Sequence, residues 1–279
     1  MITHIQIFTD GGEATREAVR FGAWLAGILR VPALLVGVAE GESDSERLES
    51  LFYDAVGMLQ EAGAEYSLEL YNGPLKRVIA ARAGSPDSLA VVGAHDKPRA
   101  WLAKGQFFSD LMEAVPAPLL YVTRARAPVR KVLVCVGGLG YELTSERLGL
   151  EIARAAGAEV RFLYVVPPID LDYPSAKTVR QHQGDLSETE TLPGRGLRRA
   201  LETAREFELS ASTRVRNGNI IQEIQGEARE GGYDLVCMGS PYSAHGLRHL
   251  YTPNVTAEVA ESLQVPLLTA RFGQAASQG

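Results

Sequence analysis

The chain has 279 residues, of which 46% are hydrophobic, and a formal net charge of −6 at pH 7. This length and apolar fraction predict about two globular domains, each with its own core. Neither half carries the basic stripe that duplex nucleic acid requires. No apolar run reaches the roughly 18 residues of a membrane helix, the start does not read as a signal peptide, and two cysteines do not make a disulfide framework. The composition favours a cytoplasmic protein without a membrane or nucleic-acid partner.

The strongest pattern is an internal repeat of a whole domain. Segments 5–12, 71–75, 88–93 and 115–120 resemble, in the same order, segments 132–138, 216–220, 234–239 and 263–268. They predict one repeat over 1–126 and a second over 129–273. The offset between equivalent residues rises from 127, for Asp10 and Gly137, to 145, for Gly73 and Gly218. The second repeat therefore contains an insertion, which we expect at about 167–195 as an irregular surface loop.

In chain order, each repeat reads strand, helix, strand, helix, strand, helix, strand, glycine loop, helix and strand. The first strands, 5–9 and 132–136, are short apolar runs typical of parallel strands buried on both faces. Helical spacing follows over 14–25 and 48–59, and Ser43 with Glu46 forms a capping-box pattern before the latter. The alternation predicts an α/β fold of two tandem five-stranded parallel sheets, each in strand order 3-2-1-4-5 between layers of helices.

The last strands of the two repeats, 119–123 and 267–271, are expected at the sheet edges. Because exposed edges invite pairing, we expect them to face each other across a pseudo-twofold axis as an intramolecular pseudo-dimer.

Two cysteines lie two residues before strand-end glycines, Cys135 before Gly137 and Cys237 before Gly239. We expect buried, reduced thiols that are nearly adjacent on one face of the sheet. A redox pair is the alternative, although neighbouring parallel strands orient cysteines poorly for a disulfide.

Ligands of open parallel sheets bind beyond the carboxyl ends of the strands, at the switch point. In each repeat this lies between the loops that follow the first and fourth strands, which are 10–12 with 93–106, and 137–140 with 239–254. The candidate ligand-contacting residues are Asp10, Gly11, Gly93, His95, Gly105 and Gln106 in the first repeat, and Gly137, Gly239, Ser240, His245, Arg248 and Asn254 in the second.

This pattern resembles the universal stress protein family over nearly the whole chain, twice. The nucleotide-binding branch of that family carries Gly-x-x-Gly, a spacer and then Gly-Ser or Gly-Thr after the fourth strand. The glycines let backbone amides approach phosphates, and the hydroxyl adds a donor at the next helix N-terminus. An aspartate at the end of the first strand supports the nucleoside. The resemblance implies a stress-response protein with ATP or AMP as the ligand.

The first repeat departs from that motif. Asp96 stands in place of the second glycine and adds negative charge, and Gln106 replaces the hydroxyl residue. Asp10 and Gly105 are kept, so we expect any nucleotide in the first half. Replacing Asp10 with alanine is then expected to weaken nucleotide binding with little loss of stability.

The second repeat departs further. Tyr242 and Pro253 replace two glycines, and Gly137 replaces the aspartate. His245 and Arg248 nevertheless give this loop a cationic face that could attract a phosphate. This is the argument for nucleotide binding in the second half instead.

Ordinary structural interpretations remain open beside these. Asp10 is equally suited to cap a turn, and His95 to lie in a solvated loop. His245 and His249 lack a third ligand, so we expect no metal site. No nucleophile elbow or Walker loop occurs, so we expect no catalytic residues.

These observations leave three functions open. The leading hypothesis is a non-catalytic binding or signalling protein of the stress response, with degenerate nucleotide sites and a protein partner or a homodimer. The second is an ATP- or AMP-binding regulatory protein that uses atypical glycine loops. The third is an enzyme, either a nucleotide hydrolase, such as a weak ATPase, or a transferase.

Overall fold

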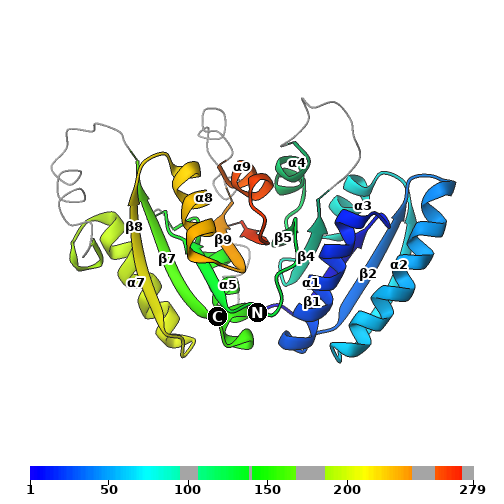
Figure 1. The fold of residues 1–279 in the computed structure, drawn as a ribbon, viewed down its shortest axis with the longest axis horizontal. Helices are drawn as coiled ribbons and strands as arrows, with labels where there is room; N and C mark the ends of the chain where they lie inside the picture. Colours follow the sequence, from blue (N-terminus) through cyan, green and yellow to red (C-terminus); the bar gives the residue numbers. More distant parts are fainter. Residues whose placement is uncertain (95–105, 138–139, 168–185, 241–254, 272–279) are drawn as a thin grey trace.

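In a computed structural model, the chain forms an α/β fold around one ten-stranded sheet (Figure 1). The structure describes residues 1–94, 106–137, 140–167, 186–240 and 255–271. The strand order is β3-β2-β1-β4-β5-β10-β9-β6-β7-β8, so that the second half of the sheet mirrors the first.

The elements of the first repeat are β1 His4–Thr9, α1 Glu13–Leu29, β2 Ala33–Ala39, α2 Glu42–Glu61, β3 Tyr66–Asn72, α3 Leu75–Arg82, β4 Ser88–Gly93, α4 Gln106–Ala114 and β5 Leu119–Val122. Those of the second are β6 Lys131–Cys135, α5 Leu143–Ala156, β7 Glu159–Val166, η2 Leu186–Glu188, α7 Leu192–Glu206, β8 Ala211–Asn217, α8 Ile220–Gly231, β9 Leu235–Gly239, α9 Val255–Ser262 and β10 Leu267–Ala270. Within each repeat the five strands are parallel, and the predicted order 3-2-1-4-5 is confirmed in both.

The prediction of two separate sheets is wrong, because the edge strands of the repeats join them. Strand β5 pairs antiparallel with β10, with Leu120 opposite Leu268. Both strands are only four residues long and fully buried, so an unpaired edge here would leave buried backbone groups without hydrogen bonds. The expectation that these two strands face each other is confirmed.

Two apolar cores cover the two faces of the sheet, and each core spans both repeats. Side chains of α1, α2, α5 and α7 contribute to the first core. Side chains of α3, α4, α8 and α9 contribute to the second. The strands of both repeats are thus sandwiched between helices, which leaves the strand ends and the two outer edges of the sheet for other roles.

Two helix starts differ from the sequence-based expectation. Helix α2 already begins at Glu42 with Gly41 as its N-cap, so the predicted capping box at Ser43 is wrong. Asp44 instead accepts a hydrogen bond from the Glu40 amide at 3.0 Å. At the end of the predicted insertion, Leu186 is buried and Thr191 caps α7, so residues 186–195 are folded rather than an irregular loop. Residues 168–185 lie outside the described part.

The prediction that the two cysteines share a face of the sheet is wrong. Strands β6 and β9 pair with Val134 opposite Cys237, so equal distances from the strand-end glycines do not place the thiols at the same level. Cys237 packs in the first core, and Cys135 lies against the second. Both are free thiols, and burial raises the pKa of Cys135 to about 12 and also raises that of Cys237.

We expect both thiols to react slowly with a thiol reagent in the native protein, because the thiolate is the reactive form and burial suppresses it. Both should label at the rate of a free cysteine after unfolding in urea. Kinetic labelling followed by mass spectrometry checks this, and fast native labelling of Cys237 would contradict the packing described above.

Candidate functional site

The first strand end is built by a tight turn between β1 and α1. The Asp10 Oδ1 atom accepts hydrogen bonds from the Gly12 amide at 2.9 Å and from the Thr15 hydroxyl at 3.1 Å. Gly11 has φ +80°, and a Cβ on it would lie 2.9 Å from the Leu48 amide nitrogen, so this position requires glycine twice over. The half-buried Asp10 side chain is therefore held by the first turn of α1, as its turn-capping interpretation predicts.

The loops after the first and fourth strands meet in both repeats through the strand-end glycines. A Cβ on Gly93 would lie 2.7 Å from Thr15 Cα, and one on Gly239 would lie 3.1 Å from Glu142 Cα. These glycines let β4 and β9 end directly against the starts of α1 and α5. The structure thus brings Gly93 to the turn that contains Asp10, and Gly239 beside the start of the helix that follows Gly137.

The second strand end contains a carboxylate that the sequence analysis did not single out. By the offset of 127, Gly137 is equivalent to Asp10 and Glu142 to Thr15. The Glu142 Oε2 atom lies 3.7 Å from the position of a Cβ on Gly137. The second repeat therefore places a carboxylate from the start of α5 beside the strand end, where the first repeat has one from the strand itself.

Glu142 belongs to a buried cluster with Glu146 and Arg199. The Arg199 Nη2 atom lies 2.8 Å from Glu146 Oε2 and 3.4 Å from Glu142 Oε1. Both glutamates are almost wholly buried, and within the described residues Glu146 Oε1 and Arg199 Nε have no hydrogen-bond partner. Burial raises the pKa of Glu146 to about 7, against the attraction of Arg199. Two carboxylates thus share one guanidinium beside the second strand end.

The sequence contained a usable signal for this cluster. Glu142 and Glu146 are four residues apart, so they lie on one face of α5, where two unpaired like charges would repel. Such a pair on an otherwise apolar helix face indicates a cationic partner on the neighbouring element.

Residues 128–271 match the sequence model of the universal stress protein family. The chain belongs to this family. No curated protein sequence matches the chain.

Three solved structures share its fold over nearly the whole length. A universal stress protein from Archaeoglobus fulgidus DSM 4304 is 12% identical with a TM-score of 0.69, and the match covers 96% of each chain. A functionally unknown protein from Pseudomonas aeruginosa PAO1 is 18% identical with a TM-score of 0.65, and the match covers 97% of this chain and 92% of that one. A putative universal stress protein from Pseudomonas aeruginosa UCBPP-PA14 is 18% identical with a TM-score of 0.65, and the match covers 97% of this chain and 93% of that one. At these identities the matches establish the fold of this universal stress protein.

Several predicted site residues lie outside the described part of the chain: His95, Gly105, His245, Arg248 and Asn254. Helix α4 begins at Gln106. Ser240 is buried and its amide donates to the Ala270 carbonyl at 3.3 Å, which continues the pairing of β9 with β10.

Among the described helices, none is long and apolar enough to cross a membrane.

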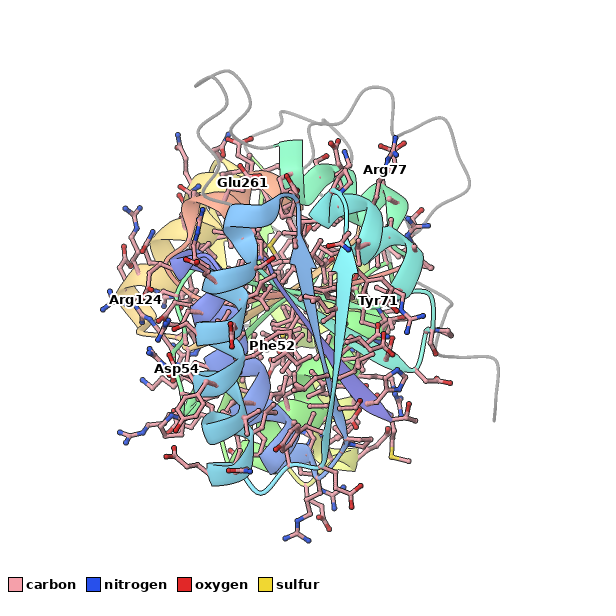
Figure 2. The ribbon with its side chains drawn as sticks, turned by 90° about the vertical axis from the view of Figure 1, so that its right-hand side faces the viewer. Phe52, Asp54, Tyr71, Arg77, Arg124 and Glu261 are labelled. Carbon is pink, nitrogen blue, oxygen red and sulfur yellow. The ribbon has the colours of Figure 1, made fainter. Side chains whose placement is uncertain are left out.

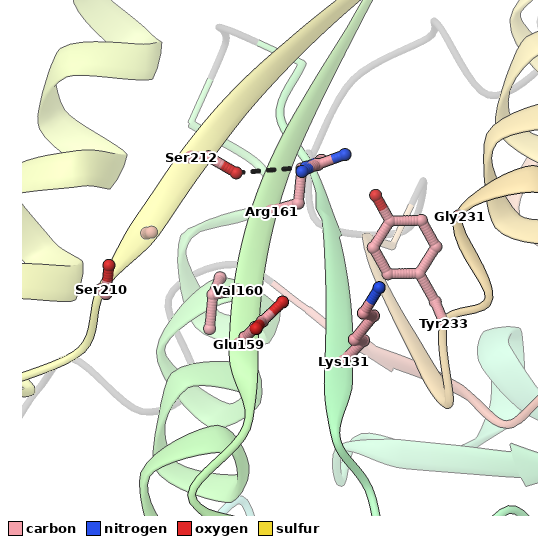
Figure 3. Close-up of a pocket in the computed structure, with 9 residues that line it drawn as sticks. Lys131, Glu159, Val160, Arg161, Ser210, Ser212, Gly231 and Tyr233 are labelled. Atoms are coloured by element: carbon pink, nitrogen blue, oxygen red, sulfur yellow. Dashed lines mark hydrogen bonds between the residues drawn. The ribbon is translucent and has the colours of Figure 1, made fainter.

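A hollow of about 260 Å³ lies at the opposite, amino-terminal ends of β6, β7 and β8 (Figure 3). Lys131 and Arg161 line it, beside the end of α8, whose negative dipole end attracts cations. Arg161 donates to the Ser212 hydroxyl at 3.1 Å, and the Tyr233 hydroxyl donates to buried Glu227 at 2.9 Å. The Arg161 Nη1 atom also lies 4.0 Å from Glu227 Oε1, which joins β7 to α8, so we assign the hollow a structural role.

Proposed function

We propose that this universal stress protein is a non-catalytic binding or signalling protein of the stress response, and that its two nucleotide sites are degenerate. In this proposal the repeats extend over 1–126 and 129–273, form an intramolecular pseudo-dimer and act in the cytoplasm.

The observation that carries the proposal is the state of the carboxylates at the two strand ends. Asp10 uses one oxygen to hold its own turn, and Glu142 shares Arg199 with Glu146. Glu142 reaches the second strand end and neutralises Arg199, so this cluster offers no net positive charge to a phosphate there, whether or not Glu146 is ionised. Together with the departures from the glycine motif, this favours loss of the ATP site in both halves.

The alternative of an ATP- or AMP-binding regulatory protein is supported by Asp10 itself. It stands half-buried at the carboxyl end of β1, and Thr15, which bonds to it, lies against the strand-end glycine of β4. This is the switch point where open sheets bind ligands. If a nucleotide binds, we expect it in the first half, with Asp10 beside the nucleoside.

Titration with AMP, ADP and ATP, followed by calorimetry and by thermal unfolding, separates these functions, because a ligand of the native state raises its stability. Degenerate sites predict no shift of the unfolding midpoint at millimolar nucleotide. A shift that grows with nucleotide concentration would support the regulatory alternative, and release of inorganic phosphate would support the enzyme.

If a nucleotide binds, Asp10→Ala should weaken binding at least about tenfold. The structure revises the expectation of little loss of stability to a cost of about 1 kcal/mol, because Asp10 accepts hydrogen bonds from Gly12 and Thr15. Thr15→Val is the matched control, since it removes a hydrogen bond to Asp10 but keeps the carboxylate. Calorimetry should find unchanged affinity in Thr15→Val. Equal affinity in Asp10→Ala would exclude Asp10 from the site.

A further inference from the structure

Strand β3 forms an open outer edge of the ten-stranded sheet. In the described part of the chain it pairs with β2 alone, from Tyr66 to Asn72. Figure 2 views the molecule from this side. The strand contains neither proline nor lysine, two residue types with which proteins commonly protect an open edge. Among the described residues, no strand pairs with its outer backbone groups.

The same edge exposes apolar side chains. Leu68 is 42% exposed and Leu70 is 61% exposed, and on the neighbouring helix α2 Tyr53 is 84% exposed. A Cβ on Gly37 would lie 2.5 Å from the Phe52 ring and 3.2 Å from Leu70 Cδ1, which places Leu70 on the α2 side of the sheet. Side chains two apart share a face, so Leu68 lies on this side as well. An apolar strip thus borders the open edge.

The opposite outer edge of the sheet differs. By the offset of 145, Thr213 and Val215 of β8 are equivalent to Leu68 and Leu70. Helix α7 packs over β8, and both residues are half-buried. Helix α2 packs over β2, which leaves the leucines of β3 at the surface. The exposed apolar strip is therefore a property of the first repeat and not of the fold.

We propose that β3 is a homodimer interface, at which the β3 strands of two copies of this chain pair antiparallel about a twofold axis. The molecule already joins its two repeats in this manner at β5 and β10. A twofold axis perpendicular to the sheet keeps the α2 sides of both copies on one face, so the two apolar strips meet and cover each other.

Charge and apolar contact together select the register of this pairing. A pairing centred on Leu70 would set Leu68 opposite the partner's Asn72, which joins an apolar with a polar side chain. Glu69 is the single charged residue of β3, and Arg82 holds it at 2.8 Å. A pairing centred on Glu69 would set two glutamates directly opposite each other, which is unfavourable. A pairing centred on Leu68 sets Leu68 opposite the partner's Leu68, Tyr66 opposite the partner's Leu70 and Glu69 opposite the partner's Ser67. This register joins apolar with apolar side chains and leaves each glutamate with its own arginine.

Pairing of β3 with β8 of a second copy is the competing arrangement. It would bring the leucines against residues that α7 already covers, and it would build an open polymer rather than a closed dimer. A strand edge buries less than a standard interface of about 1,200–2,000 Å². We therefore expect a reversible dimer with a dissociation constant in the micromolar range.

Sedimentation velocity of the full chain over a range of concentrations tests the proposal. The wild type should pass from monomer to dimer, and Leu70→Lys should raise the dissociation constant at least about tenfold. Leu192→Lys is the matched control, because Leu192 on α7 is 60% exposed and far from β3 in the strand order. Circular dichroism and thermal unfolding verify that both variants fold.

A covalent probe tests the register. Under mild oxidation, Leu68→Cys should trap a disulfide-linked dimer, whereas Leu70→Cys should trap much less, because Leu70 faces Tyr66 of the partner. Three results would overturn the proposal: a wild type that stays monomeric at about 100 µM, a dimer that Leu70→Lys leaves intact, or growth beyond the dimer as concentration rises.

Discussion

Gly149→Ala is expected to destabilise the protein by about 1–3 kcal/mol, although alanine is the better helix former. Gly149 lies in α5 against the sheet, and a Cβ on it would lie 2.5 Å from the Cys237 sulfur. Separations under 3.0 Å essentially never occur for real Cβ atoms, so the buried Cys237 side chain, the helix or the strand must shift. The equivalent Gly22 in α1 is in the same situation, 2.7 Å from two carbons of Ile7.

The prediction has two internal controls. Gly57 lies in α2 with nothing within 4 Å of its Cβ position, so Gly57→Ala should instead stabilise the protein by about 0.5–1 kcal/mol. Cys237→Ala removes the clashing sulfur, so the double variant with Gly149→Ala should be more stable than the sum of the single changes by about 1 kcal/mol or more. Urea unfolding of the wild type, the two single variants Gly149→Ala and Cys237→Ala, and the double variant measures this coupling. Additive single changes would show that the sulfur is not the obstacle.

The order of the strands could be predicted because each repeat encodes it locally. Short apolar runs such as 5–9 alternate with helical spacing such as 14–25, and that alternation permits few topologies. The sequence also indicated which strands lie at the centre of the molecule. It did not indicate that β5 and β10 would hydrogen-bond, since nothing in four apolar residues distinguishes a paired edge from a packed one.

The errors at finer scale have one physical origin: they depend on registers and on long side chains. The thiols were expected side by side, yet a one-residue stagger between β6 and β9 turns them to opposite faces. At the candidate site, Asp10 was visible at a strand end, whereas Glu142 reaches the equivalent place from a helix start. A sequence motif gives only the positions of residues along the backbone. The carboxylate of a long glutamate side chain can lie several ångströms from its backbone, so a motif does not predict where it will be.

The two repeats also differ in which element of the outer ion pair is acidic and which is basic. In the first, Arg82 at the end of α3 holds Glu69 of β3 at 2.8 Å. The position equivalent to Arg82 in the second repeat is Glu227 of α8, which holds Arg216 of β8 at 2.6 Å. Each repeat keeps an ion pair between its outer strand and the covering helix, but with the signs reversed. This arrangement makes β8 basic and gives β3 one acidic residue.

Glu146→Gln is expected to remove a pH dependence of stability worth about 3 kcal/mol, at about 1.4 kcal/mol per pKa unit. The fully buried Glu146 keeps its proton in the native state up to about pH 7, because burial raises its pKa from 4.5 to about 7. In the unfolded chain it loses the proton near pH 4.5. Between these values the native state binds more protons, so this contribution to stability is complete below about pH 4.5 and is lost as the pH rises to about 7.

Urea unfolding of the wild type and of Glu146→Gln at pH 5 and pH 8 measures this contribution. Other groups titrate in the same range, so the informative quantity is the difference between the two proteins at each pH. The glutamine cannot ionise, and Arg199 retains Glu142 as its partner. The variant should gain stability relative to the wild type as the pH rises, whereas Glu202→Gln, on the exposed side of α7, should follow the wild type. An equal pH dependence in wild type and Glu146→Gln would mean that Glu146 is ionised in the native protein at neutral pH and that Arg199 compensates both carboxylates.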